Sequence, residues 1–186
     1  LQVRHDRSGN FRLLRTLGRR YVVRAEKLDP VRYKDVVVSS TRIRRVSSVG
    51  RGDEAGALLG HHYFVDGRIV EGAGRGRTLG FPTANLLAEN ELLPPRGVYA
   101  TLATVDGQVE PSVPNIGRRP TFGDAKGDIV ETHLLAMERD LYGARLRLAF
   151  LRRLREERAF ADADALREQV AADIRQARRL FDRISL

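Results

Sequence analysis

The sequence predicts a mainly β protein with one long C-terminal helix and a small α/β segment at its N-terminus. From residue 61 onward, short apolar runs alternate with Gly, Pro and Asp turns, which is typical of an antiparallel sheet. A strongly amphipathic stretch ends the chain, and short strand-like and helix-like stretches alternate over residues 1–60. We therefore expect two parts, residues 1–60 and residues 61–186.

The N-terminal part should resemble the end of an α/β unit, because its predicted strands and helices alternate. Its expected elements are a strand end at 1–4, a helix starting near Ser8–Asn10 with Gly18 as its C-cap, a strand at 21–25, a helix from near Ser40 past Arg45, and a short helix over 53–59 before Gly60.

The larger part should contain several short strands that form an antiparallel sheet, closed or nearly closed. Strands are expected at 63–70, 97–105, 129–137 and 144–151. Pro111, Pro114 and Pro120 are expected between strands, because proline cannot donate to a strand ladder.

The C-terminal helix follows from apolar residues at spacings of three and four. They are Leu166, Val170, Ile174, Ala177 and Phe181. Asp162 or Asp164 can cap its start, and arginines near its end suit the helix dipole. We expect this helix to cover the barrel.

Composition excludes several classes of function. The 186 residues include no cysteine, so disulfides, thiolate zinc sites and cysteine nucleophiles are absent. No apolar run approaches the ~18 residues of a membrane span, and no signal-peptide pattern begins the chain. A cytoplasmic protein without a membrane partner is expected. The only methionine is Met137, so we expect a piece of something longer.

The net charge of +9 raises the alternative of a nucleic-acid-binding module. Residues 1–60 hold 14 Lys and Arg against 6 Asp and Glu, whereas residues 61–186 hold 19 against 18. The basic excess therefore belongs to the first third. With only 6% aromatic residues and no stacking cluster, we expect no nucleic-acid partner.

The densest chemical signal is the glycine-rich stretch 72–85. Gly72, Gly74, Gly76 and Gly80 allow the backbone to approach a bulky anion and to point N–H groups at it. Arg75 and Arg77 add charges that suit phosphate oxygens. The stretch is neither a Walker A loop nor a Rossmann turn. The alternative is a flexible hairpin with no ligand.

Thr83 and Asn85 follow this loop with a spacing of two residues. In an extended chain that spacing places both side-chain oxygens on one side. Hydroxyl and amide oxygens suit Mg²⁺, which retains waters and bridges nucleotide phosphates. Mg²⁺ bound with a nucleotide phosphate is therefore the expected cofactor.

The same stretch, Gly-x-Gly-x-Gly-Arg-x-Leu-Gly-Phe-Pro-Thr-Ala-Asn, resembles the signature of riboflavin kinases. Five further blocks, at 95–99, 115–122, 131–135, 141–143 and 154–160, resemble that family's motifs in the same order. The resemblance covers about 120 residues. It implies a six-stranded Greek-key barrel with a C-terminal helix, and transfer of the ATP γ-phosphate to the riboflavin 5′-hydroxyl to give FMN.

The resemblance also implies roles for individual residues. Thr83 and Asn85 would hold magnesium, and Glu131 would be the catalytic base. The nucleotide phosphates would lie on Gly72, Gly74, Arg77 and Thr83, and the flavin end would be lined by Arg155 and Arg158. His133 shares a strand face with Glu131 and is expected to orient or pack.

Each of these residues also has an alternative interpretation without a catalytic or binding role. Glu131 could be a sheet-surface carboxylate paired with an arginine, and Arg155 and Arg158 could be solvated charges. The family commonly carries an acidic residue a few positions after Glu-Thr-His, where this chain has Ala136-Met137-Glu138.

Residues 38–44 resemble the Ile-Ser-Ser-Thr-x-Ile-Arg motif of the adenylyltransferase module in bifunctional FAD synthetases. Ser39, Ser40, Thr41 and Arg44 would form a phosphate site at a helix start, or else a simple helix cap. That module also needs an N-terminal His-x-Gly-His loop, which this sequence lacks. We therefore expect a partial adenylyltransferase-like segment that does not make FAD.

Two further alternatives concern the whole chain. One is a flavin- or nucleotide-binding module without catalysis. The other is a fragment of an FAD synthetase that retains ATP binding without adenylyl transfer. The expected partners are riboflavin or FMN, ATP or ADP, and a missing adenylyltransferase portion.

Overall fold

The structure, a computed structural model, describes residues 2–3, 9–72, 74, 76, 80–118, 128–136 and 140–184. The chain forms two compact units, Leu1–Val38 and Ser39–Leu186. Each unit is described by itself.

The first unit contains helix α1 (Phe11–Arg20) and two small strand pairs. The strands are β1 (Gln2–Val3), β2 (Gly9–Asn10), β3 (Arg32–Tyr33) and β4 (Val36–Val37). Asn10 caps α1, because its side-chain oxygen accepts a hydrogen bond from the Leu13 amide at 3.0 Å.

Two predictions for this unit are wrong. Gly18 does not end α1, which continues to Arg20. The Val23 amide donates to the Gly18 carbonyl at 2.8 Å, and a Cβ at Gly18 would lie 2.3 Å from the Val23 carbonyl oxygen. Glycine is therefore required by a close backbone approach. The predicted strand at 21–25 is a turn followed by irregular chain, in which Val22 has a φ of 55°.

The second unit begins with the predicted helices α2 (Ser40–Ser48) and α3 (Gly52–Leu59). Ser39 caps α2 by accepting from the Arg42 amide at 3.3 Å. Gly60 ends α3 in the left-handed conformation that favours glycine, with a φ of 75°. Both helices belong to the same compact unit as the strands that follow.

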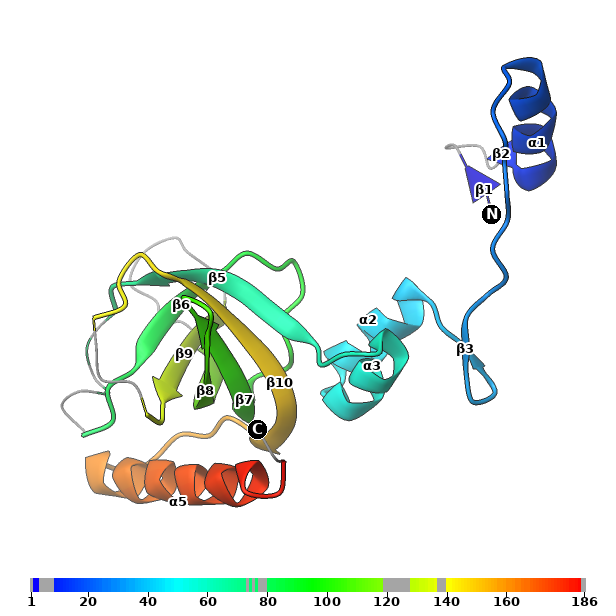
Figure 1. Cartoon of the computed structure of the whole chain (residues 1–186). Coiled ribbons are helices and arrows are strands. Elements are labelled where there is room, and N and C mark those ends of the chain that lie inside the picture. Colours follow the sequence, from blue (N-terminus) through cyan, green and yellow to red (C-terminus); the bar gives the residue numbers. More distant parts are fainter. Residues whose placement is uncertain are drawn as a thin grey trace. The chain divides into compact units, whose positions relative to one another are not determined.

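Those strands close into a six-stranded antiparallel barrel (Figure 1), as predicted. They are β5 (Phe64–Val70), β6 (Ala84–Ala88), β7 (Gly97–Val105), β8 (Gln108–Arg118), β9 (Asp128–Leu134) and β10 (Arg145–Arg155). The order around the barrel is β10-β5-β6-β9-β8-β7. Strands β6 to β9 form a Greek key, because β6 pairs with β9 while β7, β8 and β9 pair consecutively.

Alternation of side chains separates the inside of the barrel from the outside. Val65, Leu86, Val130 and Leu148 belong to the interior core, and each is at most 4% exposed. A second core lies on the outer face, where Val98, Ala100 and Val113 pack against Ala177 and Phe181 of helix α5 (Ala163–Phe181). Asp162 caps this helix, as expected.

The proline prediction is wrong for β8. Pro111 and Pro114 lie inside this central strand, opposite Leu102 of β7 and Thr132 of β9 respectively. The register between β7 and β8 skips Tyr99 and Ala100 and resumes at Thr101. Pro114 falls at this interruption, where the ladder with β7 needs no N–H from it, whereas Pro111 lies in register opposite Leu102. Strands β6 and β8 were not foreseen.

The phenol of Tyr99 gives this fold an expected alkaline sensitivity. Burial raises the pKa of Tyr99 to about 12, partly offset by Arg153. Because the pKa of Tyr99 is higher in the folded than in the unfolded protein, the neutral phenol stabilises the fold. This stabilisation is complete below pH 10, near the unfolded pKa, and is lost as the pH rises through 12, the folded pKa. We expect the unfolding free energy of the wild type to fall by on the order of 2 kcal/mol more than that of Tyr99→Phe between pH 9 and 12. Urea unfolding across this range checks it, and parallel curves for the two proteins would contradict it.

Candidate active site

A row of polar residues crosses three adjacent strands on the outer face of the barrel. Glu131 of β9 lies directly opposite Asn85 of β6 on one side and Asn115 of β8 on the other. Its neighbours Val130 and Thr132 point inward and are 1% and 0% exposed. Directly opposed residues of antiparallel strands share a face, with Cβ atoms about 5 Å apart. The register therefore brings Glu131 and Asn85 together.

The glycine-rich loop packs onto Asn85 and Thr83. A Cβ at Gly72 would lie 1.8 Å from Asn85 Nδ2 and 2.8 Å from its Oδ1. A Cβ at Gly76 would lie 2.8 Å from Thr83 Oγ1, and the Phe81 amide donates to the Gly76 carbonyl at 2.9 Å. Any other residue at Gly72 or Gly76 would displace these side chains. The loop backbone can lie this close to Thr83 and Asn85 because glycine has no side chain.

Asn85 is suited to a cation. Its side chain is only 6% exposed, and its Oδ1 has no hydrogen-bond partner in the described part of the chain. A buried acceptor without a partner is unusual and points to a ligand. Thr83 Oγ1 and Asn85 Oδ1 are hard oxygens of the kind that Mg²⁺ accepts together with water and phosphate oxygens. Over the described residues, no group of three His, Cys, Asp or Glu side chains offers a rival metal site.

His133 supports the chain just before Thr83. Its Nδ1 lies 2.8 Å from the Pro82 carbonyl oxygen, and its ring meets the Phe81 ring edge-on at 5.8 Å. The contact joins β9 to the residue that precedes Thr83.

Arg155 and Arg158 are held by helix α5. The Arg155 guanidinium bonds both carboxylate oxygens of Asp173 at 2.8 to 3.0 Å, and the Asp173 side chain is 4% exposed. Arg158 donates to Gln169 Oε1, and Gln169 donates to Asp173 at 2.7 Å. Both arginines lie over the Phe160 ring. The Arg155 side chain is 19% exposed, whereas Arg158 is an exposed residue.

Sequence reasoning missed Asp173 and Gln169. A signal was present, because Asp173 occupies a position on the apolar stripe of α5, three residues after Val170 and four before Ala177. A charged residue on a buried helix face implies a buried partner.

We expect Asp173→Asn to lower the unfolding free energy by about 2 kcal/mol, because it weakens a largely buried, charge-assisted bond to Arg155. Chemical denaturation measures this. Asp164→Asn is the matched control on the same helix, since its 3.0 Å pair with Arg167 is 84% exposed at the carboxylate and should matter by less than about 0.5 kcal/mol. Equal losses in both variants would contradict the assignment.

Glu157, which the sequence analysis did not single out, lies near the Asn115 end of the polar row. Its Oε1 accepts from the Arg118 amide at 3.3 Å and would lie 2.4 Å from a Cβ at Gly117. The Asn115 Nδ2 lies near the same point, 3.2 Å from that Cβ. The segment after β10 therefore contacts the end of β8 beside the row.

The remaining predicted site residues make no described contact with the polar row. Gly74 has a φ of +66° and open space around its Cα. Arg75, Arg77 and residues 119–127 lie outside the described residues. Ser39, Ser40, Thr41 and Arg44 lie in the exposed first turns of α2, where the Ser39 side chain acts as the cap.

No helix in the described part of the chain has the length and apolar character needed to cross a membrane.

Comparison with solved structures supports the fold. A Streptococcus pneumoniae protein named a macrolide-efflux protein aligns with 96% of this chain and 57% of its own, with a TM-score of 0.80 and 30% identity. A riboflavin kinase from Trypanosoma brucei aligns with 64% of this chain and 79% of its own, with a TM-score of 0.50 and 25% identity.

Comparison of sequences is more specific. Relatives named bifunctional riboflavin kinase/FMN adenylyltransferase are 39% identical over 94% of this chain in Pseudomonas fluorescens and 38% identical over 81% in Bacillus subtilis. The chain spans about half of each relative, 56% and 49%. The riboflavin kinase (Flavokinase) family profile matches residues 59–181, the span that holds the barrel, the polar row and α5. The chain therefore belongs to the riboflavin kinase family.

Proposed function

We propose that this chain transfers the γ-phosphate of ATP to the 5′-hydroxyl of riboflavin, giving FMN and ADP. The observation that carries the proposal is the register that sets Glu131 opposite Asn85, with Gly72 packed on the Asn85 side chain. One face thus offers a carboxylate, a cation ligand and a close backbone approach for phosphates. These are the parts that phosphoryl transfer needs.

In this proposal Glu131 accepts the proton of the riboflavin 5′-hydroxyl as its oxygen bonds to the γ-phosphorus. The bond from that phosphorus to the β,γ-bridging oxygen breaks, and ADP leaves with the electron pair. A primary alcohol is a weak nucleophile unless a base accepts its proton during attack. Glu131 is partly exposed, so the substrate hydroxyl could reach it from outside the barrel.

Thr83 and Asn85 would hold Mg²⁺, which would neutralise charge on the phosphates. Gly72, Gly74, Arg77 and Thr83 would bind the phosphates themselves. Arg155 and Arg158 would line the flavin end, where Asp173 and Gln169 hold their guanidinium groups in place. Alignment of the reacting groups, rather than covalent chemistry by the protein, would supply most of the acceleration.

We propose further that residues 1–60 correspond to part of an adenylyltransferase-like module, with residues 61–186 as the kinase part. The support is the Ser39–Arg44 motif at the start of α2, where unpaired helix N–H groups favour a phosphate. The relatives' names include FMN adenylyltransferase.

The test is incubation of the protein with riboflavin, ATP and Mg²⁺, followed by chromatographic separation of FMN from FAD. FMN should accumulate with one ADP per FMN, and chelation of the metal should stop it. Binding of riboflavin and ATP without turnover would instead support the alternative of a non-catalytic binding module.

A further inference from the structure

Asn115 of β8 belongs to the polar row but has no part in the proposed phosphoryl transfer. It lies directly opposite Glu131 of β9, so the two side chains share the outer face with Cβ atoms about 5 Å apart. Its other strand neighbours on that face, Val98 and Val113, are apolar and belong to the core beneath α5. The half-buried side-chain amide of Asn115 makes no hydrogen bond within the described part of the chain.

The next outward position along β8 carries no side chain, because it is Gly117. A Cβ there would lie 3.2 Å from Asn115 Nδ2 and 2.4 Å from Glu157 Oε1. The two polar atoms therefore converge on one point, although no hydrogen bond joins them directly among the described residues. The Arg118 amide holds Glu157 in this position by donating to its Oε1 at 3.3 Å.

An amide N–H and a carboxylate that flank one point suit a hydroxyl group. The hydroxyl oxygen can accept from the amide while its O–H donates to the carboxylate. A carboxylate offers about four acceptor positions, so the bond to the Arg118 amide leaves Glu157 able to accept another. A phosphate oxygen would instead be repelled by the two nearby carboxylates, Glu131 and Glu157.

The position of this pair relates it to the proposed reaction. Asn115 lies across the ladder from Glu131, the proposed base for the reacting hydroxyl. Glu157 lies in the chain between Arg155 and Arg158, which are proposed to line the flavin end. In riboflavin the ribityl chain joins the reacting hydroxyl to the ring, and it carries further hydroxyl groups along its length. That chain would therefore pass Asn115 and Glu157.

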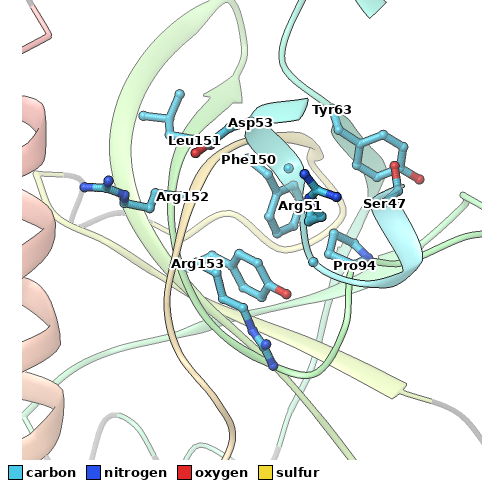
Figure 2. Close-up of a pocket in the computed structure, with 12 residues that line it drawn as sticks. Ser47, Arg51, Asp53, Tyr63, Pro94, Phe150, Leu151, Arg152 and Arg153 are labelled. Atoms are coloured by element: carbon cyan, nitrogen blue, oxygen red, sulfur yellow. The ribbon is translucent and has the colours of Figure 1, made fainter. Parts of the chain in front are cut away.

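The aromatic cavity elsewhere in this unit offers no such contact. It has a volume of about 200 Å³ and lies where the turn between α2 and α3 meets one end of the barrel (Figure 2). Tyr63, Tyr99 and Phe150 line it, and both tyrosine hydroxyls donate to backbone carbonyl groups. Neither Asn115 nor Glu157 lines it. Recognition of the substrate chain therefore falls to the polar row.

We propose that Asn115 and Glu157 determine the specificity for the acceptor by binding a ribityl hydroxyl other than the one that reacts. This inference rests on the proposed function. The Asn115 amide donates to that hydroxyl, and the hydroxyl donates to the Glu157 carboxylate. A flavin without it leaves both groups unpaired in the complex, so it is selected against.

The test compares riboflavin with a flavin analogue in which a 5-hydroxypentyl chain replaces the ribityl chain. The analogue keeps the ring and the terminal hydroxyl and lacks the other hydroxyls. At saturating Mg-ATP, kcat/KM of the wild type should be at least about 100-fold higher for riboflavin. Asn115→Leu should lower kcat/KM at least about tenfold for riboflavin but less than about threefold for the analogue. The two-substrate comparison isolates the contact with the hydroxyl.

Glu157→Gln is a second variant, because glutamine can still accept from the Arg118 amide and the residue is exposed. It should lower kcat/KM about fivefold for riboflavin and less than about twofold for the analogue, since the bond to the hydroxyl loses its charge. Gln108→Met is the matched control, an exposed amide at the other end of β8, and should change neither value. Urea unfolding shows which variants are folded, and Glu157→Gln decides if Asn115→Leu is not.

Equal losses for both flavins in the two variants, or equal use of both flavins by the wild type, would overturn this inference and leave the kinase reaction intact. A wild type that phosphorylates neither flavin would overturn the proposed function, and the inference with it.

Discussion

Glu131→Gln is expected to lower kcat for riboflavin phosphorylation by about 1,000-fold, because it removes the proposed base while keeping the size and position of the side chain. Glu131 lies between Asn85 and Asn115 in the barrel, and glutamine can occupy the same place with no change in strand register. Riboflavin affinity should change less than about threefold, since the lost interaction belongs to the transition state.

Steady-state FMN formation and flavin fluorescence titration measure the two effects. Glu89→Gln is the matched control, because Glu89 is a carboxylate on the outside of the barrel that pairs with Arg145 at 2.7 Å and is 47% exposed. It should keep nearly full activity. Near-normal turnover of Glu131→Gln would remove Glu131 from the mechanism.

Gly72→Ala is expected to weaken Mg-ADP binding by at least about tenfold and to lower kcat with it. The added Cβ would lie 1.8 Å from Asn85 Nδ2, so the loop or the Asn85 side chain must move. Either movement separates the backbone from the proposed cation ligand. Displacements of about 1 Å in such sites can cost 100-fold in rate.

Isothermal titration with Mg-ADP and steady-state kinetics check this second prediction. Gly52→Ala is the control, because a Cβ at Gly52 meets nothing within 4 Å and its backbone φ is outside the strained region. It should bind Mg-ADP as the wild type does. If Gly72→Ala bound Mg-ADP normally, the packing of this loop on Asn85 would have no part in nucleotide binding.

Local features were predictable from sequence. Ser39 and Asp162 cap the helices that follow them, and Gly60 ends α3, because capping depends on residues within one turn. Four strands were located by their apolar runs. The errors arose where a contact from outside the element overrides local preference. Pro114 lies in a central strand, and Gly18 lies within a helix because the Val23 carbonyl approaches it.

The candidate site likewise combines features that were predictable from local sequence with contacts that were not. The residue types at Thr83, Asn85 and Glu131, and the family they indicate, came from short motifs. The motifs did not reveal that Asp173 and Gln169 hold Arg155 and Arg158, since those contacts join α5 to the end of β10.

The sequence by itself determined the protein's family and its closed β architecture. The tertiary structure alone decided that Glu131 faces Asn85, and that an aromatic cavity forms beside α2 and α3. Spacing along a chain specifies which face of a strand a side chain takes, but the partner across the ladder depends on how the apolar side chains of all six strands fill the barrel together.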